Sequence, residues 1–406
     1  MLPEGWKHTT FEDHIDLLSG NPFKSAEYSN DPTDIRLLRG DNIEPGKLRW
    51  RDAKFWPTDR IHNLTRYSLQ QGDFVIAMDR TWVSSGLKVA EVRSADLPCL
   101  LVQRVSRIRA LPTLCQSLLK QYFSGHSFEN YVKSVETETA VPHISAQQIK
   151  DFPFLLPPLP EQKKIAAILS TWDRAIEGTE KLLANSQQQK KALMQQLLTG
   201  KKRLPGFTGE WRNTSLYEIC TLNPKSPKIE ELTQISFIPM DGVSNDARIS
   251  DVTTRAFKKE NNGFSYFQKK DVLVAKITPC FENGKGGYLN ALPTQHGFGS
   301  TEFHVLRATA DADGKFIYYI TTSERFRILG EMNMQGSAGQ KRVPKDFIER
   351  FSVNLPPLPE QKAIAAVLTT ADEEITAIES DLLRLRQEKK ALMQQLLTGK
   401  RRVTVD

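Results

Sequence analysis

A stretch of 45 residues occurs twice in this chain of 406, and it constrains the fold more than any other feature. Residues 156–200 return as residues 355–399, at a constant offset of 199 (355 − 156) and without a gap. Counting the matched positions gives 29 identities in 45. Chance does not produce such a match. The chain is therefore a duplicated unit, and each copy ends in the same long segment.

Each copy of the repeat is typical of a long helix. Pro160 suits the first turn of that helix, because its missing N–H would be unpaired there anyway, and Glu161 follows where the helix dipole favours an acid. From Ile165 onward, ten positions follow the 4-3 spacing of a heptad seam; seven are apolar in the first copy and nine in the second. Gly200 and Gly399 then suit the C-terminal caps.

The length of this apolar seam predicts what the helix packs against. A helix of about 37 residues spans roughly 55 Å, so a domain at one end cannot cover it. Only a short basic link, residues 201–205, separates the first helix from the second half of the chain. We therefore expect the second helix to run back along the first in an antiparallel coiled coil. The alternative is that each helix docks on its own domain.

The two stretches outside the helices indicate mixed domains of short strands and helices. Residues 35–43 align with residues 235–243, and the strand pattern 73–77 aligns with 271–275. The sequence also predicts a helix over Phe11 to Leu18 with Thr10 as its N-cap, and another near residues 112–124.

These patterns predict an α+β fold. We expect two similar globular domains of mixed α/β structure, separated by an antiparallel two-helix coiled coil and related by a pseudo-two-fold axis. The expected boundaries are residues 1–155 and 204–354 for the globular domains, and residues 156–203 and 355–402 for the helices.

Composition narrows the class of protein. The chain has 55 basic and 48 acidic residues, a net charge of +7 that permits a nucleic-acid partner. Its four cysteines lie far apart without a C-x-x-C pair, which argues against disulfides and zinc. No run of about 18 apolar residues predicts a membrane span, and no signal peptide pattern opens the sequence. We expect a cytoplasmic protein.

Motifs of common enzymes are missing from the sequence. It contains neither a phosphate-binding G-x-x-x-x-G-K-[ST] loop nor a dinucleotide-binding G-x-G-x-x-G pattern after a strand. The seven histidines are scattered, without a metalloprotease or Ser/His/Asp arrangement. We therefore expect a chain that is not an enzyme, with no catalytic, cofactor-binding or metal-binding residues of its own.

The contrast between the matched helices and the diverged domains favours binding. It indicates that the two helices serve the same function, while the two domains bind two different targets of one kind. Duplex DNA offers such targets, because its base edges differ with sequence. Polar and basic side chains near the matched strands can bond bases or phosphates. The candidates are Arg39, Asn42, Arg80, Thr81, Lys88, His143, Lys276, Thr278, Asn283, Lys285, Gln340, Lys341 and Arg342.

Four motifs carry a resemblance to a known family. They are LPPLPEQ before each helix, KKALMQQLLTGK at each helix end, ITPCFENGKG at 277–286 and STEFHVLR at 300–307. With its two-half layout, the whole chain resembles the specificity subunit of a type I restriction-modification system. The recognition segments of that family vary widely, so they indicate membership and give no target sequence.

The resemblance implies a function and a set of partners. Each globular domain would recognise one half of a bipartite site in double-stranded DNA, and the helices would set the gap. The helices would also bind two modification subunits, which use S-adenosylmethionine to methylate adenine N6, and two restriction subunits would add activities that need ATP and Mg²⁺. The match of KKALMQQLLTG exceeds what a seam needs, which indicates a shared partner contact at Gln195, Gln196, Gln394 and Gln395.

Two alternatives stay open at this point. One is the specificity subunit of a related bipartite system, in which one partner polypeptide carries both methylation and cleavage. The other is a structural coiled-coil scaffold with two protein-binding heads and no DNA contact.

Overall fold

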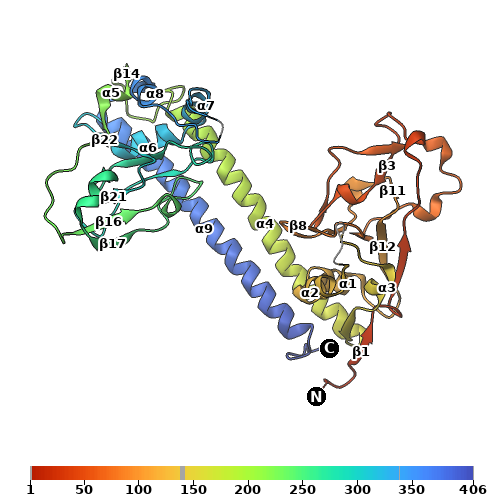
Figure 1. Cartoon of the computed structure of the whole chain (residues 1–406). Coiled ribbons are helices and arrows are strands. Elements are labelled where there is room, and N and C mark those ends of the chain that lie inside the picture. Colours follow the sequence, from red (N-terminus) through yellow and green to blue (C-terminus); the bar gives the residue numbers. More distant parts are fainter. Residues whose placement is uncertain (1, 138–141, 338, 406) are drawn as a thin grey trace. The chain divides into compact units, whose positions relative to one another are not determined.

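A computed structural model of the chain describes residues 2–137, 142–337 and 339–405 (Figure 1). The chain divides into two compact units: Met1–Glu180 with Asp381–Asp406, here unit 1, and Lys181–Ser380, here unit 2. Each unit combines one globular part with a section of each long helix, α4 (Leu159–Leu197) and α9 (Leu358–Leu396).

In its described residues, the globular part of unit 1 contains two larger sheets and three two-stranded pairs. One antiparallel sheet has the order β10-β7-β12-β2, and a second has the order β11-β3-β6, with β11 parallel to β3. The strands are β2 (Ile15–Ser19), β3 (Ile35–Leu38), β6 (Lys54–Trp56), β7 (Phe74–Ala77), β10 (Val89–Glu91), β11 (Cys99–Leu101) and β12 (Val105–Ala110). The hairpin β4 (Ile43–Glu44) with β5 (Lys47–Leu48) and the pair β1 (Lys7–Thr10) with β13 (Pro153–Leu156) are two of the three pairs.

Three helices cover the larger sheet of unit 1. They are α1 (Gln116–Phe123), α2 (His126–Val135) and α3 (Ala146–Lys150). The core under them is aromatic: Phe11 is fully buried, with its ring centroid 4.9 Å from those of both Phe152 and Phe154. The same hydrophobic cluster includes Ile165 and Leu169 of α4, so the start of the long helix belongs to this core.

Unit 2 repeats the plan. Its first sheet has the order β15-β22-β19-β20, and its second the order β17-β16-β21-β18, with β21 parallel to β16. The strands are β14 (Arg212–Ser215), β15 (Cys220–Leu222), β16 (Gln234–Ile238), β17 (Thr253–Ala256), β18 (Ser265–Phe267), β19 (Val272–Ala275), β20 (Gly286–Tyr288), β21 (Gly297–Gly299), β22 (Phe303–Ala308) and β23 (Ser352–Leu355). The helices are α5 (Leu216–Ile219), α6 (Gly314–Thr322), α7 (Glu324–Met332) and α8 (Lys345–Arg350).

The predicted α+β class and the internal correspondence are confirmed. The sheet β10-β7-β12-β2 of unit 1 matches β20-β19-β22-β15 of unit 2, strand for strand. A buried ion pair recurs with it: Arg307 donates to Asp271 at 2.7 and 2.9 Å, and Arg109 donates to Asp73 at the equivalent place. The two globular parts therefore share one framework despite their different sequences.

The helix predicted over Phe11 to Leu18 is wrong. Thr10 ends strand β1, and residues 15–19 form strand β2, which pairs with β12 over five residues. Tertiary pairing overrides local propensity here, because the strand completes a sheet that buries Ile15. At the corresponding place in unit 2 the chain does form a short helix, α5. The helix predicted near residues 112–124 is confirmed as α1.

The long helices pack in opposite directions within each unit, as predicted. In unit 1, Lys389 of α9 reaches Asp173 of α4 at 2.6 Å, while Arg402, which follows α9, pairs with Glu161 at the start of α4. In unit 2, Ser186 donates to Glu374 at 3.2 Å, and Arg203 after α4 pairs with Glu360 at 2.6 Å. All ten seam positions of each helix are buried or half-buried, which confirms the heptad prediction.

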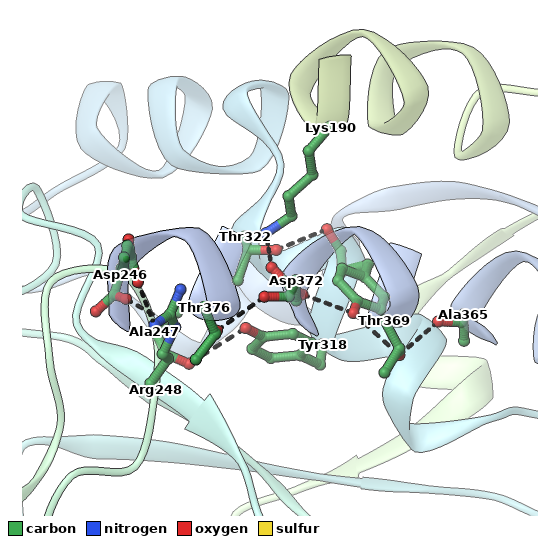
Figure 2. A network of polar contacts seen from close by, with 12 residues as sticks. Lys190, Asp246, Ala247, Arg248, Tyr318, Thr322, Ala365, Thr369, Asp372 and Thr376 are labelled. Carbon is green, nitrogen blue, oxygen red and sulfur yellow. Dashed lines mark hydrogen bonds and ion pairs between the residues drawn. The ribbon is translucent and has the colours of Figure 1, made fainter. Parts of the chain in front are cut away.

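The two lysines that interrupt the seam, one in each helix, have matched partners. Lys190 lies 2.5 Å from Asp372 of α9, whose carboxylate also accepts the Tyr319 hydroxyl at 2.8 Å (Figure 2). In unit 1, Asp173 accepts Lys389 and the Gln121 amide at 2.7 Å. Each aspartate therefore contacts both the facing long helix and a helix of the globular part. Such polar seam positions help to fix helix register.

The EQ pair of the LPPLPEQ motif anchors each helix to its globular part. Glu360 is fully buried and accepts the Trp211 indole N–H at 3.0 Å in addition to Arg203; Glu161 accepts Trp6 in the same way at 3.2 Å. The helices end as expected, since Gly200 and Gly399 have φ values of +74° and +68°. Only glycine adopts this left-handed conformation without strain.

Candidate nucleic-acid interface

Three segments of unit 1 meet where strand β7 ends. The segment after β7 contains a small hairpin, β8 (Trp82–Val83) with β9 (Gly86–Leu87). Asp79 forms a β-bridge with His143, and its carboxylate lies 2.6 Å from the His143 ring; the Arg80 N–H donates to the Pro142 carbonyl at 2.8 Å. Lys88, at the end of the segment, lies beside Asp41 in the turn after β3. The predicted residues of this half therefore come from one edge of the domain.

The same three segments meet in unit 2 where β19 ends. Ile277 forms a β-bridge with Arg342, and the Thr278 N–H donates to the Lys341 carbonyl at 2.9 Å. Lys285 lies near the turn after β16, with its ammonium group 3.3 Å from the Met240 carbonyl and 3.4 Å from the Asp241 carboxylate. We call the edge formed by these segments in each unit the loop edge.

Several predicted side chains face solvent at the loop edges. Arg80 is exposed and has a left-handed backbone with φ +47°, which is uncommon for a residue with a side chain. Asn283, Gln340 and Lys341 are exposed as well. Side chains in this position can reach a ligand without rearrangement of the domain.

Other predicted side chains are used inside the domains. Asn42 is 2% exposed, and its amide joins the Arg39 N–H and the Arg49 carbonyl, so it holds the turn after β3. Thr81 is fully buried and donates to Glu136 at 2.6 Å. Thr278 is half-buried and donates to the exposed Glu282 at 2.7 Å, at the surface of its loop. In this structure, these groups shape the loops from within.

The remaining predicted side chains lie between these extremes. Arg39 is half-buried and donates to the Asp52 carbonyl at 3.3 Å. His143 is half-exposed, as is Arg342, which bonds Glu302 through Nη2 at 2.8 Å and Nε at 2.9 Å. Lys276 is half-buried near the same Glu302. The loop edges therefore carry a mixture of exposed, ion-paired and half-buried cations.

Charge and burial perturb three groups near the loop edges. Burial lowers the pKa of Lys88, an effect that Asp41 opposes. The hydrogen bonds from Arg342 hold the pKa of Glu302 below its usual range, so this carboxylate stays ionised and orients the guanidinium. Burial also lowers the pKa of His304, whose Nε2 contacts the Val343 carbonyl at 2.9 Å.

Sequence reasoning missed two arginines at these sites. Arg104 is 72% exposed and pairs with Asp79 at 2.9 Å, which places a further cation at the loop edge of unit 1. Arg327 of α7 donates to the carbonyls of Phe281 and Gly284, both at 3.2 Å, from beneath the loop of unit 2. Burial lowers its pKa to about 10. Neither arginine lies in a motif, so only the folded structure shows these contacts.

The predicted partner contacts lie on the helix surface. Gln195, Gln196, Gln394 and Gln395 are all exposed, and Gln195 donates to Glu324 of α7 at 3.3 Å. Their role stays a prediction. In the part of the chain that the structure describes, no helix is long and apolar enough to span a membrane, and no group of three or more His, Cys, Asp or Glu side chains could hold a metal ion.

Comparison with known proteins shows which family shares this architecture. The family model for the type I restriction modification DNA specificity domain matches residues 3–185 and again residues 208–385. The EcoAI specificity subunit of Escherichia coli is 39% identical over 156 residues, which cover 38% of this chain and 26% of that protein. The MjaVIII specificity subunit of Methanocaldococcus jannaschii is 29% identical over 204 residues, covering 50% of this chain and 48% of that protein. The chain thus spans less than half of the length of these two relatives.

Other similarities extend over the whole chain. The putative MjaX specificity subunit of Methanocaldococcus jannaschii is 23% identical over 421 aligned residues, covering 99% of this chain and 95% of that protein. The crystal structure of a type I restriction-modification S subunit from M. genitalium has a TM-score of 0.59 at 13% identity, covering 97% of this chain and 96% of that one. At this identity the structural likeness supports the fold alone. Because the family model covers both globular parts and most of both long helices, the chain belongs to the family of type I restriction modification DNA specificity domains.

Proposed function

We propose that this chain is the DNA specificity subunit of a type I restriction-modification complex. Each globular part would recognise one half of a bipartite site in duplex DNA. The observation that carries this proposal is the loop edge, which recurs on the same framework with different side chains. Arg80 of unit 1 corresponds to Thr278 of unit 2, and His143 corresponds to Arg342. One backbone plan with two sets of donors suits two different base sequences.

The long helices would set the gap between the half-sites and bind the modification subunits. Their seam residues are buried or half-buried, whereas the identical Gln195, Gln196, Gln394 and Gln395 remain exposed. A residue that is kept in both copies but is not needed for packing suits a contact with another protein. Because the surface occurs twice, one chain would bind two identical partners.

The chemistry would belong to those partners. Two modification subunits would use S-adenosylmethionine to methylate adenine N6, and two restriction subunits would use ATP and Mg²⁺ for translocation and cleavage. This chain would select the DNA site and carry out no reaction itself. It would act in the cytoplasm, where duplex DNA is available.

Mapping of N6-methyladenine in the host genome tests the proposal. We expect methylation at one asymmetric bipartite motif, lost when this chain is deleted and restored when it is supplied again. Arg80→Ala should relax selection at one half of the motif, and Lys341→Ala at the other half. Methylation that persists at the same motif in the deletion strain would refute the assignment.

A gel shift separates the proposal from a protein scaffold. The full chain, alone and with its modification partner, should retard duplex DNA that carries the mapped motif more strongly than a duplex with both half-sites scrambled. A protein-binding scaffold would bind neither duplex.

A further inference from the structure

A hollow of about 320 Å³ lies beside the loop edge of unit 2. Its walls come from the turn after β15, the segment before β18 and the end of β19. Aromatic rings, among them Phe264 and Tyr266, form its apolar wall. The polar side chains that line it are those of Asn223, Lys225, Ser226, Asn262, Ser265 and Lys276.

The charged residues that line this hollow have one sign. Lys225 and Lys276 both line it, and no acidic residue is among its lining residues in the described part of the chain. Two lysines that line one hollow favour an anion there over a cation. Glu302 interacts electrostatically with Lys276, and its carboxylate also accepts hydrogen bonds from Nε and Nη2 of Arg342.

Two larger grooves differ in this respect. A groove of about 830 Å³ in unit 2 is lined by Asp246, Glu324, Asp372 and Glu379 as well as by lysines and arginines, and Lys190 and Lys191 pair with acids there. A groove of about 370 Å³ in unit 1 is also lined by several acids. The hollow at Lys225 is thus the one of the three whose lining favours an anion.

The turn that carries Lys225 is held in place before any ligand arrives. Asn223 has φ +51°, its side-chain oxygen accepts the Val305 N–H at 2.9 Å, and its amide nitrogen lies 3.3 Å from the His304 ring. Opposite the turn, the Ser265 hydroxyl donates to the Phe303 carbonyl at 3.2 Å. A fixed turn loses little conformational entropy when a ligand binds.

We propose that this hollow holds a backbone phosphate of the duplex bound by unit 2. Lysine is a point-charge donor to phosphate, and Asn262 adds an amide donor, whereas the Ser226 hydroxyl donates to the Pro227 carbonyl at 3.0 Å. The proposal rests on the function proposed above and deepens it. Such a contact fixes the position of the domain on the DNA without selecting a base.

Unit 1 supplies a matched control. The Asn223-Pro224 turn recurs there as Asn21-Pro22, where Phe23 stands at the place of Lys225; Lys24, one residue further on, is 81% exposed and lies 3.9 Å from Glu27. Met78 stands at the place of Lys276. The paired lysines are therefore a property of unit 2, and Lys24→Gln removes the same charge from the equivalent turn.

Salt dependence of DNA binding tests the phosphate contact. Fluorescence anisotropy would follow the full chain binding a mixed-sequence 30-base-pair duplex between about 50 and 200 mM salt, a range in which phosphate contacts dominate the change in affinity. Lys225→Gln should weaken binding and reduce the slope of log Kobs against log salt by about 0.9, the release expected for one phosphate. Lys225→Arg should restore the slope, and Lys24→Gln should leave it unchanged.

Three results would overturn this site. One is a Lys225→Gln slope equal to that of the wild-type chain; another is an equal loss in Lys24→Gln. The third is a thermal shift by inorganic phosphate that depends on Lys225 while the DNA slope does not, because the hollow would then bind free phosphate and not the duplex. Failure of the wild-type chain to bind any duplex, alone or with its modification partner, would instead refute the proposed function.

Discussion

Gln361→Ala should destabilise unit 2 more than any surface change on the helices. Gln361 is fully buried at the start of α9. Its amide oxygen accepts the Asp313 N–H at 2.8 Å, and its amide nitrogen donates to the carbonyls of Asp311 and Pro356 at 3.1 and 2.9 Å. Alanine removes all three hydrogen bonds and leaves three backbone groups without these partners.

The magnitude follows from these contacts. A buried polar group left unpaired costs about 1–3 kcal/mol, and a cavity adds to this. Some relaxation or water entry offsets part of the sum, so we expect a loss of about 3–5 kcal/mol in the free energy of unfolding of unit 2. Gln361→Met keeps most of the volume and should isolate the loss that is due to the hydrogen bonds.

Hydrogen exchange measured by mass spectrometry suits this test, because a chain of two units does not unfold in one two-state step. Amides of α6 and of the start of α9 should exchange faster in Gln361→Ala, while unit 1 stays unchanged. Gln162→Ala should do the same to unit 1, since Gln162 bonds Cys115, Thr113 and Pro157 at 2.8, 3.0 and 2.9 Å.

The exposed Gln196 provides the control for unit 2. Gln196→Ala should change the free energy of unfolding by less than about 0.5 kcal/mol, as surface substitutions usually do. Equal effects of Gln361→Ala and Gln196→Ala would refute the anchoring role of the motif.

Three further predictions concern binding and pH. Arg327→Met should remove support from the loop that carries Asn283 and lower affinity about tenfold for DNA with an intact unit 2 half-site, an effect of about 1.4 kcal/mol; duplexes with each half-site scrambled in turn would measure it, and equal losses at both halves would contradict it. Replacing all four exposed glutamines by alanine should weaken co-purification with the modification subunit while circular dichroism stays unchanged; undiminished assembly would exclude this contact. The four residues are Gln195, Gln196, Gln394 and Gln395. Burial lowers the pKa of His304 from its ordinary value of 6.5, so unit 2 should keep full stability above about pH 6.5 and lose it as pH falls through the lowered pKa. His304→Gln should flatten that loss between pH 7 and 5, and identical pH profiles of urea unfolding would disprove it.

The helical part of the fold follows from sequence because one physical rule governs it. A seam of 4-3 spacing must be covered along its whole length, and the duplicated helix is the partner at hand. Even the polar interruptions obey this rule, since Lys190 and Lys389 meet aspartates of the facing helix. The matched strands were predictable for a similar reason, because buried strands of four apolar residues leave a clear pattern.

The roles of single polar residues were harder to predict. Asn42 and Thr81 carry the same donors and acceptors as residues that contact bases. In the folded domain, however, Asn42 donates to a backbone carbonyl and Thr81 donates to Glu136. The choice depends on partners that lie far away in the sequence. The same limit applies to Phe11 to Leu18, where pairing with β12 decided in favour of a strand.

Unit 1 is formed by two separate segments of the chain, and this affects its folding during synthesis of the protein. Its hydrophobic cluster joins Ile165 and Leu169 to Met393 and Leu396, and its buried Glu161 pairs with Arg402. Residues 181–380, a continuous run, lie between these partners. At about 5–20 residues per second the ribosome needs roughly 10–40 s to make them. Unit 2 can close during translation, whereas the half that is made first keeps part of its core uncovered until the second long helix has emerged.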